Sequence, residues 1–357
     1  MFIYLNANRN FSQSTICKGC HPTIYKEFYN SSHKKSTLKS SPLHKALWDI
    51  HPKKEQNNYS CAKCHEPTNK EDSGISCAYC HSIESIQEHT KVNKNILNKN
   101  QKVFFSANED GKKNIKISFK EESTFFGLFT KTKGSPFHKI DYSNSGYYDG
   151  KICMGCHSHK KNKNDFTVCS MKKAEFKPNE DNCISCHMPK VLGTATTIKK
   201  TKTHTFHGFA GVNNRPDLLA KYIKLDIKFN DNGFEVFIKN SADHPLFLHA
   251  LRVAKLNISI KRAEKTIKLQ PTIFVKILGK DNKPAMVWEA DSIIKNSMIK
   301  AKENRIIKYD FKLEKDDIVN IEFGYYKVNP KVLKKLNIKN KNKITKFTTL
   351  IEKSFRK

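Results

Sequence analysis

Cys153-Met-Gly-Cys156-His157 is one of five copies of the pattern Cys-x-x-Cys-His in this chain of 357 residues. Two cysteines three positions apart lie on the same side of a helical turn. Both thiols can therefore add to the vinyl groups of one porphyrin, and the adjacent imidazole then faces the iron. A single Cys-x-x-Cys also occurs in redox pairs and zinc ribbons. Five copies, each followed directly by histidine, favour covalent haem over a zinc site or a disulfide framework.

The five motifs use ten of the eleven cysteines. We predict five covalently bound haems c, each with one iron, and no separate catalytic residue. The remaining cysteine, Cys169, is expected to be a free packed thiol, with an intermolecular link as the alternative. The predicted attachment residues are Cys17, Cys20, Cys61, Cys64, Cys77, Cys80, Cys153, Cys156, Cys183 and Cys186, and the predicted proximal ligands are His21, His65, His81, His157 and His187.

Motif content, apolar alternation and charge divide the chain into three parts and predict an α+β fold. Residues 1–203 hold all five motifs among short helices and loops, with a hairpin-type insertion at residues 100–133. Apolar and polar residues alternate over several short runs in residues 204–326, beginning with Tyr222–Phe229, which predicts a β-sandwich-like domain. Residues 327–357 hold 11 Lys or Arg and the single acid Glu352, so we expect a mobile tail or a solvated helix.

The net charge of the chain and the compartment in which haem is attached indicate which partners to expect. The formal charge is +31, and ten propionates on five haems would leave it near +21. Such a surface attracts acidic redox proteins; neither a nucleic-acid partner nor a membrane span is expected. Haem is attached to these motifs outside the cytoplasm, which predicts a periplasmic or cell-surface respiratory protein. Residues 1–5, Met-Phe-Ile-Tyr-Leu, are shorter than the apolar core of a signal peptide.

Several segments resemble a known family. Cys17 to His33 reads Cys-x-x-Cys-His-Pro-x-x-Tyr-x-Glu-Phe-x-x-Ser-x-His, which resembles the multihaem cytochromes typified by the tetrahaem electron acceptor of hydroxylamine oxidation. The segment from Gly74 to His81 is similar to the family's second paired motif, and Ser135-Pro-Phe-His138 and His204-Thr-Phe-His207 resemble longer members with a C-terminal β domain. The resemblance implies two-histidine haems in close pairs. Members often carry Gly-His-x-x-Pro-x-Gly in the β domain, from which Asp243-His244-Pro245 departs.

Ten of the fifteen histidines remain for the far side of five irons. His33 is the first candidate because it lies one helical stretch beyond the first motif and matches the family. We expect one of His204 and His207 to bind iron, and favour His204. His44 is a further candidate, whereas His51, His159 and His249 are expected to be solvent or packing residues. The predicted distal ligands are His33, His138, His204, His89 and His244.

Two functions remain open at this point. The first is an electron-transfer protein that passes electrons through five haems between periplasmic partners. The second is a reductase that acts on a small nitrogen or sulfur oxyanion at one iron with an open coordination site. Ammonia-forming nitrite reductases with five haems use Cys-x-x-Cys-Lys at that iron, and this pattern is absent from the sequence. The number of open irons distinguishes the two functions.

Overall fold

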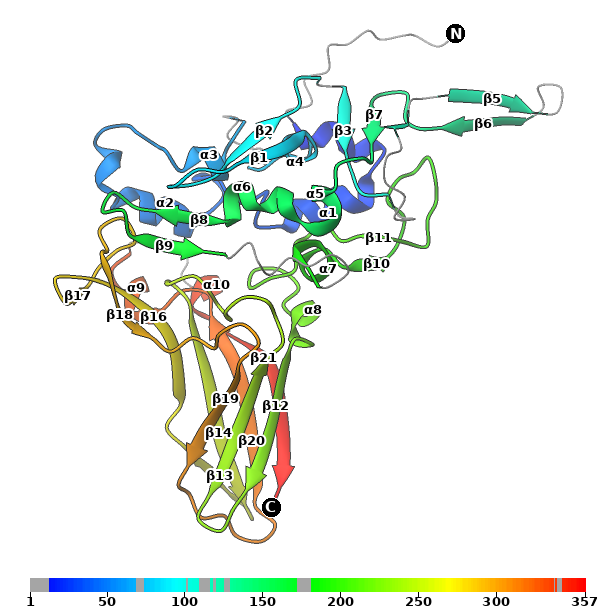
Figure 1. Ribbon diagram of the computed structural model, residues 1–357. Coiled ribbons are helices and arrows are strands. Elements are labelled where there is room, and N and C mark those ends of the chain that lie inside the picture. Colours follow the sequence, from blue (N-terminus) through cyan, green and yellow to red (C-terminus); the bar gives the residue numbers. More distant parts are fainter. Residues whose placement is uncertain are drawn as a thin grey trace. The chain divides into compact units, whose positions relative to one another are not determined.

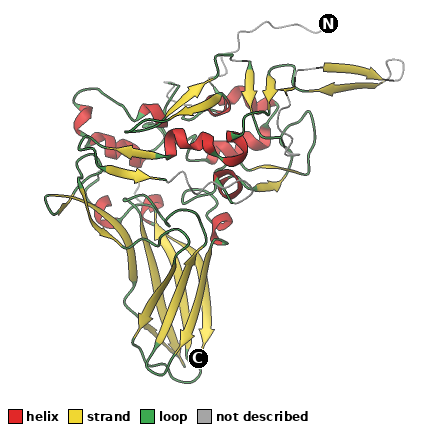
Figure 2. Ribbon diagram, viewed as in Figure 1, coloured by secondary structure: helices red, strands yellow, loops and turns green. Residues whose placement is uncertain are grey.

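A computed structural model describes residues 13–68, 74–100, 102–108, 116–117, 120–124, 129–171, 181–336, 338 and 342–357. The start of the chain, considered above as a signal segment, lies outside these residues. The fold is α+β, as predicted, with 20% helix and 34% strand. The chain divides into two compact units. Helices gather mainly in the first unit, and the second is built mostly from strands (Figure 2).

The first unit comprises Met1–His157 and Phe176–Phe209. Its helices are short, and prolines and capping side chains mark where two of them begin. Pro22 and Pro42 occupy first turns, and the hydroxyl of Ser41 accepts the backbone N–H of His44. The helical elements are η1 (Ser14–Gly19), α1 (Pro22–Asn30), α2 (Pro42–Asp49), η2 (Pro52–Lys54), α3 (Ala62–His65), α4 (Cys77–His81), α5 (Gly146–Asp149), η3 (Lys151–Cys153), α6 (Met154–His157) and α7 (Cys183–His187).

Small sheets connect these helices (Figure 1). The hairpin predicted over residues 100–133 is only partly formed. β3 and β4 do not pair with each other; both pair with β7, β3 in parallel and β4 antiparallel, and the hairpin is β5–β6. The strands are β1 (Ile83–Gln87), β2 (Lys94–Leu97), β3 (Val103–Phe105), β4 (Lys116–Ile117), β5 (Lys120–Thr124), β6 (Phe129–Lys133), β7 (Lys139–Asp141), β10 (Lys190–Leu192) and β11 (Thr203–Thr205).

The second unit, Ser158–Glu175 with Ala210–Lys357, is the predicted β-sandwich. A sheet ordered β12-β13-β19 packs against a sheet whose central order is β16-β14-β20-β21. The elements are β8 (His159–Lys161), β9 (Thr167–Ser170), α8 (Asp217–Ala220), β12 (Ile223–Phe229), β13 (Phe234–Asn240), β14 (Val253–Arg262), β15 (Lys265–Lys268), β16 (Thr272–Lys280), β17 (Lys283–Pro284), β18 (Ser292–Asn296), β19 (Asn304–Tyr309), β20 (Ile318–Tyr326), α9 (Pro330–Leu333), α10 (Asn342–Thr345) and β21 (Phe347–Arg356).

Alternation along the strands explains the sandwich. Val236 and Ile238 on β13 and Ile321 and Phe323 on β20 are completely buried, while the residues between them are more exposed. Successive side chains of a strand point to opposite faces, so one face of each sheet forms the apolar core. The second unit holds most of the buried apolar residues of the described chain, whereas the first unit contributes few, among them Phe28, Phe105 and Phe206.

The last part of the basic C-terminal segment is a strand rather than a mobile tail or a solvated helix. Phe347–Arg356 forms β21, which pairs antiparallel with β20 over its length. Its apolar residues Leu350, Ile351 and Phe355 pack against the core. Composition alone was misleading because the lysines concentrate before this strand, and the strand itself carries alternating apolar residues. The described residues include no helix with the length and hydrophobicity to cross a membrane.

Candidate haem-binding site

All five motifs, numbered 1 to 5 in chain order from Cys17 to His187, lie in the first unit. Each has its cysteines on a short helical turn. In motif 5, Asn182 caps α7 by accepting the backbone N–H groups of Ile184 and Ser185, and the Ser185 hydroxyl accepts the N–H of Asn182. This capping box fixes the turn that carries Cys183 and Cys186. None of the eleven cysteines forms a disulfide. The motifs therefore present paired thiols of the kind that a covalent haem requires.

Four of the five proximal histidines face a second histidine from a distant part of the chain. The ring centroids of His21 and His138 are 6.5 Å apart, those of His157 and His33 6.1 Å, and those of His81 and His207 6.2 Å. His65 and His44 are closer, at 4.3 Å. A bond from a metal to an imidazole nitrogen is about 2 Å long, so two imidazoles on opposite sides of one metal have centroids about 6 Å apart. The first three separations match this value.

Hydrogen bonds leave the Nε2 atoms of several of these histidines available. The Nδ1 atoms of His21, His81 and His207 lie 2.9, 2.6 and 2.7 Å from the carbonyl oxygens of Ala195, Phe105 and Thr205. An Nδ1–H group that donates to a carbonyl fixes the tautomer in which Nε2 carries the free electron pair. This is the arrangement that metal-binding histidines adopt.

Burial keeps the imidazoles neutral, which is the form that binds iron. Burial and the nearby His157, His65 and His187 lower the pKa of His33 to about 3. Burial also lowers the pKa of His207 to about 3, with the neighbouring His81 adding to the effect. The pKa values of His81 and His138 are lowered for the same main reason. These four rings are uncharged at neutral pH, so their environment fits a haem ligand.

Thiols of different motifs contact one another. Cys17 shares a hydrogen bond with Cys77, Cys64 with Cys156, and Cys153 with Cys183. Cys80 lies near enough to Cys153 and Cys156 to help raise the pKa of both. Since each thiol is an attachment point for a porphyrin, these contacts bring the attachment points of different motifs together.

The contacts give an order of the motifs that differs from their order in the sequence. Motif 1 contacts motif 3, motif 3 lies beside motif 4, and motif 4 contacts motifs 2 and 5. The thiol contacts of motifs 2 and 3, which are neighbours in the sequence, are with motifs 4 and 1. Among the described thiol contacts, motif 4 is central and motif 1 lies at one end.

His204, the favoured candidate of its pair, has another contact. Its Nε2 lies 2.9 Å from the Glu27 carboxylate, and the ring is 1% exposed. The other carboxylate oxygen of Glu27 accepts the backbone N–H of His207 at 2.8 Å. His204 and His207 are three residues apart, and their spacing does not show which ring turns toward His81. In the structure His207 faces His81 and His204 contacts Glu27, which makes His207 the stronger candidate ligand.

The other two predicted distal ligands lie elsewhere. His89 is in the exposed turn between β1 and β2, where its Nδ1 accepts the backbone N–H of Lys91 at 3.3 Å. His244 belongs to the second unit, and its Nδ1 is 3.0 Å from the carbonyl oxygen of Pro245. The structure brings neither into one of the four facing pairs described above. His44, a further candidate from the sequence, is in such a pair. It lies in the first turn of α2, which begins at Ser41 and Pro42.

Glycines allow close approaches around the motifs. Gly74 has a φ of +54°, and a Cβ placed there would lie 2.3 Å from the carbonyl oxygen of His33. Gly150 has a φ of +81°, and a Cβ there would lie 2.8 Å from the Cβ of Cys183. Both positions require glycine for conformation and for space. The loop before motif 3 can therefore pack on the backbone of His33.

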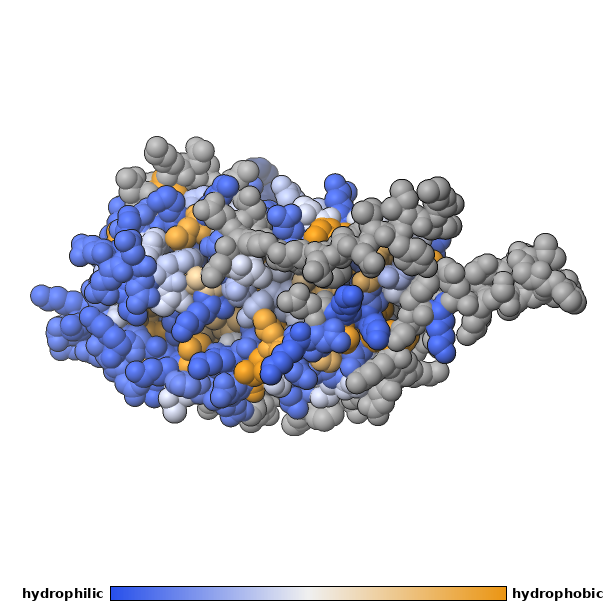
Figure 3. Space-filling view, turned by 90° about the horizontal axis from the view of Figure 1, so that it is seen from above, coloured by the Kyte–Doolittle hydropathy of each residue, from blue (hydrophilic) through white to orange (hydrophobic). Residues whose placement is uncertain are grey.

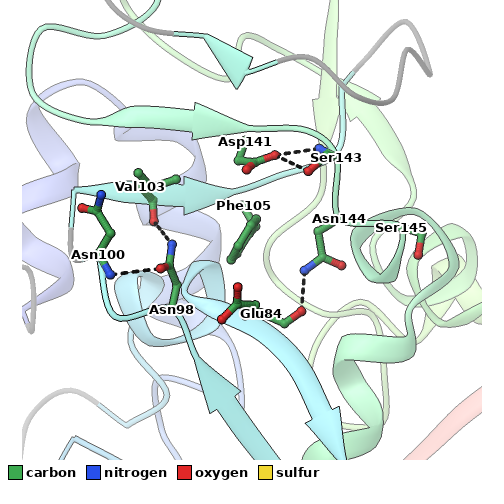
Figure 4. A pocket seen from close by; sticks show the side chains of 9 residues that line it. All are labelled: Glu84, Asn98, Asn100, Val103, Phe105, Asp141, Ser143, Asn144 and Ser145. Atoms are coloured by element: carbon green, nitrogen blue, oxygen red, sulfur yellow. Dashed lines mark hydrogen bonds between the residues drawn. The ribbon is translucent and has the colours of Figure 1, made fainter.

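A polar cavity of about 560 Å³ lies beside motif 3 (Figure 4). Phe105 lines the cavity, and its carbonyl oxygen is hydrogen-bonded to Nδ1 of His81 in motif 3. Asp141 is buried and accepts the hydroxyl of Ser143 at 2.6 Å. The cavity is lined by Glu84, Asn98, Asn100, Val103, Phe105, Asp141, Ser143, Asn144 and Ser145. Two carboxyl groups and no Lys or Arg among these nine residues disfavour an oxyanion there.

Comparisons with known proteins agree with this fold. No family model and no curated protein matches the sequence. The structure is similar to the crystal structure of a penta-haem cytochrome c552 from Thermochromatium tepidum, with a TM-score of 0.71 and 18% sequence identity. The alignment covers 96% of this chain and 98% of that chain. The chain therefore shares, over nearly its whole length, the fold of that cytochrome.

Proposed function

We propose that this chain is a multihaem c-type cytochrome that carries five covalent haems and transfers electrons between redox proteins in the periplasm or at the cell surface. The facing histidine pairs carry this proposal. Two imidazoles on one iron close its coordination shell, which suits an electron carrier and excludes substrate from the metal. When bound, each haem iron supplies a centre that takes up and releases one electron.

The residues of the chain have three tasks in this proposal. Ten thiols attach the haems, and the five motif histidines bind their irons. His33, His44, His138 and His207 would provide second ligands, and the contact of His207 Nδ1 with the carbonyl oxygen of Thr205 fixes the orientation of that ring. Burial of the rings lowers the local dielectric response, which is one of the factors that set reduction potentials. The partial resemblance to the hydroxylamine-oxidation cytochromes supports the same role.

The alternative is a reductase of a small nitrogen or sulfur oxyanion. It requires an iron with an open coordination site, and the three facing histidine pairs whose ring centroids lie about 6 Å apart disfavour such a site at motifs 1, 3 and 4. The acidic lining of the cavity beside motif 3 would also repel an oxyanion. We therefore favour electron transfer.

The first test is the haem load. Mass spectrometry of the denatured protein, matured in a periplasm, should show five covalent haems. Cys183→Ala with Cys186→Ala should give four, because thioether bonds cannot form at motif 5. Cys169→Ser is the matched control and should keep five, since this thiol is outside every motif. A wild-type chain that carries four haems or fewer would contradict the proposal.

A further inference from the structure

The loop between β10 and β11 is bound to motif 1. The backbone N–H of Thr197 donates to the carbonyl oxygen of Cys20 at 2.9 Å. The carbonyl oxygen of Ala195 is 2.9 Å from Nδ1 of His21. The loop thus contacts two successive residues of the motif, one of them the proximal histidine. Any molecule that binds this loop is held close to the haem of motif 1.

Internal hydrogen bonds hold the loop in one shape. The N–H of Gly193 donates to the carbonyl oxygen of Lys202 at 3.0 Å, which closes the loop at its base. The hydroxyl of Thr194 accepts the N–H of Thr201 at 3.0 Å and donates to the carbonyl oxygen of Lys199 at 3.3 Å. A loop with this many internal bonds presents its outward side chains in fixed positions, so docking on it orders little additional backbone.

The outward side chains are apolar and basic. Leu192 is 78% exposed and Ile198 is 48% exposed. Lys199, Lys200 and Lys202 are exposed beside them. The sequence from Asn182 to Pro216 contains no Asp or Glu. The loop therefore combines apolar contacts with uncompensated positive charge, and apolar residues within a charged rim are typical of protein interfaces.

The face seen in Figure 3 is largely hydrophilic, and its hydrophobic residues form small separate spots. Positive charge alone is spread over the chain, since 65 Lys and Arg oppose 34 Asp and Glu. What distinguishes the loop is the combination of lysines with exposed Leu192 and Ile198, directly on a haem motif. Motif 1 is also at one end of the described thiol contacts, which suits a point of electron entry or exit.

We propose that the loop of residues 192–202 is the docking surface for an acidic redox protein, which exchanges electrons with this chain at the haem of motif 1. This inference rests on the proposed function. Lysines steer and orient the acidic partner, and Leu192 and Ile198 form the apolar centre of the contact. One electron moves from the reduced partner to the ferric iron of motif 1, or in the reverse direction from the ferrous iron to the oxidised partner.

The test compares two variants with equal loss of charge in the haem-loaded chain. Lys199→Gln, Lys200→Gln and Lys202→Gln are combined in the first. Lys224→Gln, Lys228→Gln and Lys239→Gln, exposed lysines on β12 and β13, are combined in the second. Stopped-flow spectroscopy measures the second-order rate of reduction by an acidic plant-type ferredoxin. At about 50 mM salt the loop variant should be slower by about tenfold and the sandwich variant by less than about twofold.

A second measurement does not depend on electron transfer. Acetylation of Lys199, Lys200 and Lys202 should slow down in the presence of oxidised ferredoxin, whereas Lys224, Lys228 and Lys239 should react as before. Equal rate losses in the two variants, or protection of the sandwich lysines instead, would overturn the docking surface. The haem count and spin state of the same samples test the proposed function separately: five low-spin haems with equal rate losses reject the docking loop alone.

Discussion

Replacing His33 with alanine should convert about one iron in five from low spin to high spin, with all five covalent haems retained. His33 faces His157 at a centroid distance of 6.1 Å, and burial holds its pKa near 3, so the ring is a neutral ligand throughout the physiological pH range. Its loss leaves the iron of motif 4 with one protein ligand. Electron paramagnetic resonance of the ferric protein measures the change, since the iron of motif 4 should be low spin in the wild type.

Two further variants make this result specific. His33→Met should restore a low-spin iron, because a thioether also binds haem iron, and should raise the reduction potential of that haem. His89→Ala is the matched control: His89 lies in an exposed turn, so its removal should leave the spectrum unchanged. If His33→Ala keeps a fully low-spin spectrum, His33 is not a ligand. A new high-spin signal in His89→Ala would return that residue to the ligand set.

The covalent part of the site was predictable because it is local. Two thiols and an imidazole within five residues lie on one turn, whatever surrounds them, and the structure has such a turn at each motif. The sandwich was predictable for a similar reason, since alternation along Ile223–Phe229 or Val319–Phe323 directly assigns a buried face. In both cases the informative residues are neighbours in the chain.

The second histidines were harder to predict because the pairs are distant in sequence. His33 faces His157, and His138 faces His21, across more than a hundred residues. No local period encodes such a pairing. The boundary of the second unit was missed for the same reason: Ser158–Glu175 lies between motifs 4 and 5 in the sequence but folds with the β-sandwich. Pairing of β21 with β20 likewise depends on contacts that the composition of the tail conceals.

Replacing His204 and replacing His207 should have different effects on the spin state of the iron of motif 3. His207→Ala should produce a high-spin iron at motif 3, since His207 faces His81 at 6.2 Å and its Nδ1 is bonded to Thr205. His204→Ala should leave this iron six-coordinate, because the Nε2 of His204 is engaged with Glu27. The same spectroscopic measurement on both variants decides which histidine binds iron. A high-spin signal in His204→Ala alone would reverse the assignment.

The carboxylate of Glu27 contacts both His204 and His207. One oxygen of its carboxylate lies against His204 and the other accepts the backbone N–H of His207, so Glu27 orients the loop that carries the ligand. In Glu27→Gln the amide oxygen can still accept the N–H of His207, and the iron should stay low spin. The loss of a partly buried negative charge near the haem would destabilise the ferric form, which should raise one reduction potential by tens of millivolts. Glu27→Ala removes both contacts and should add a partial high-spin signal that Glu27→Gln lacks. Identical spectra and potentials in wild type and both variants would show that Glu27 does not position His207.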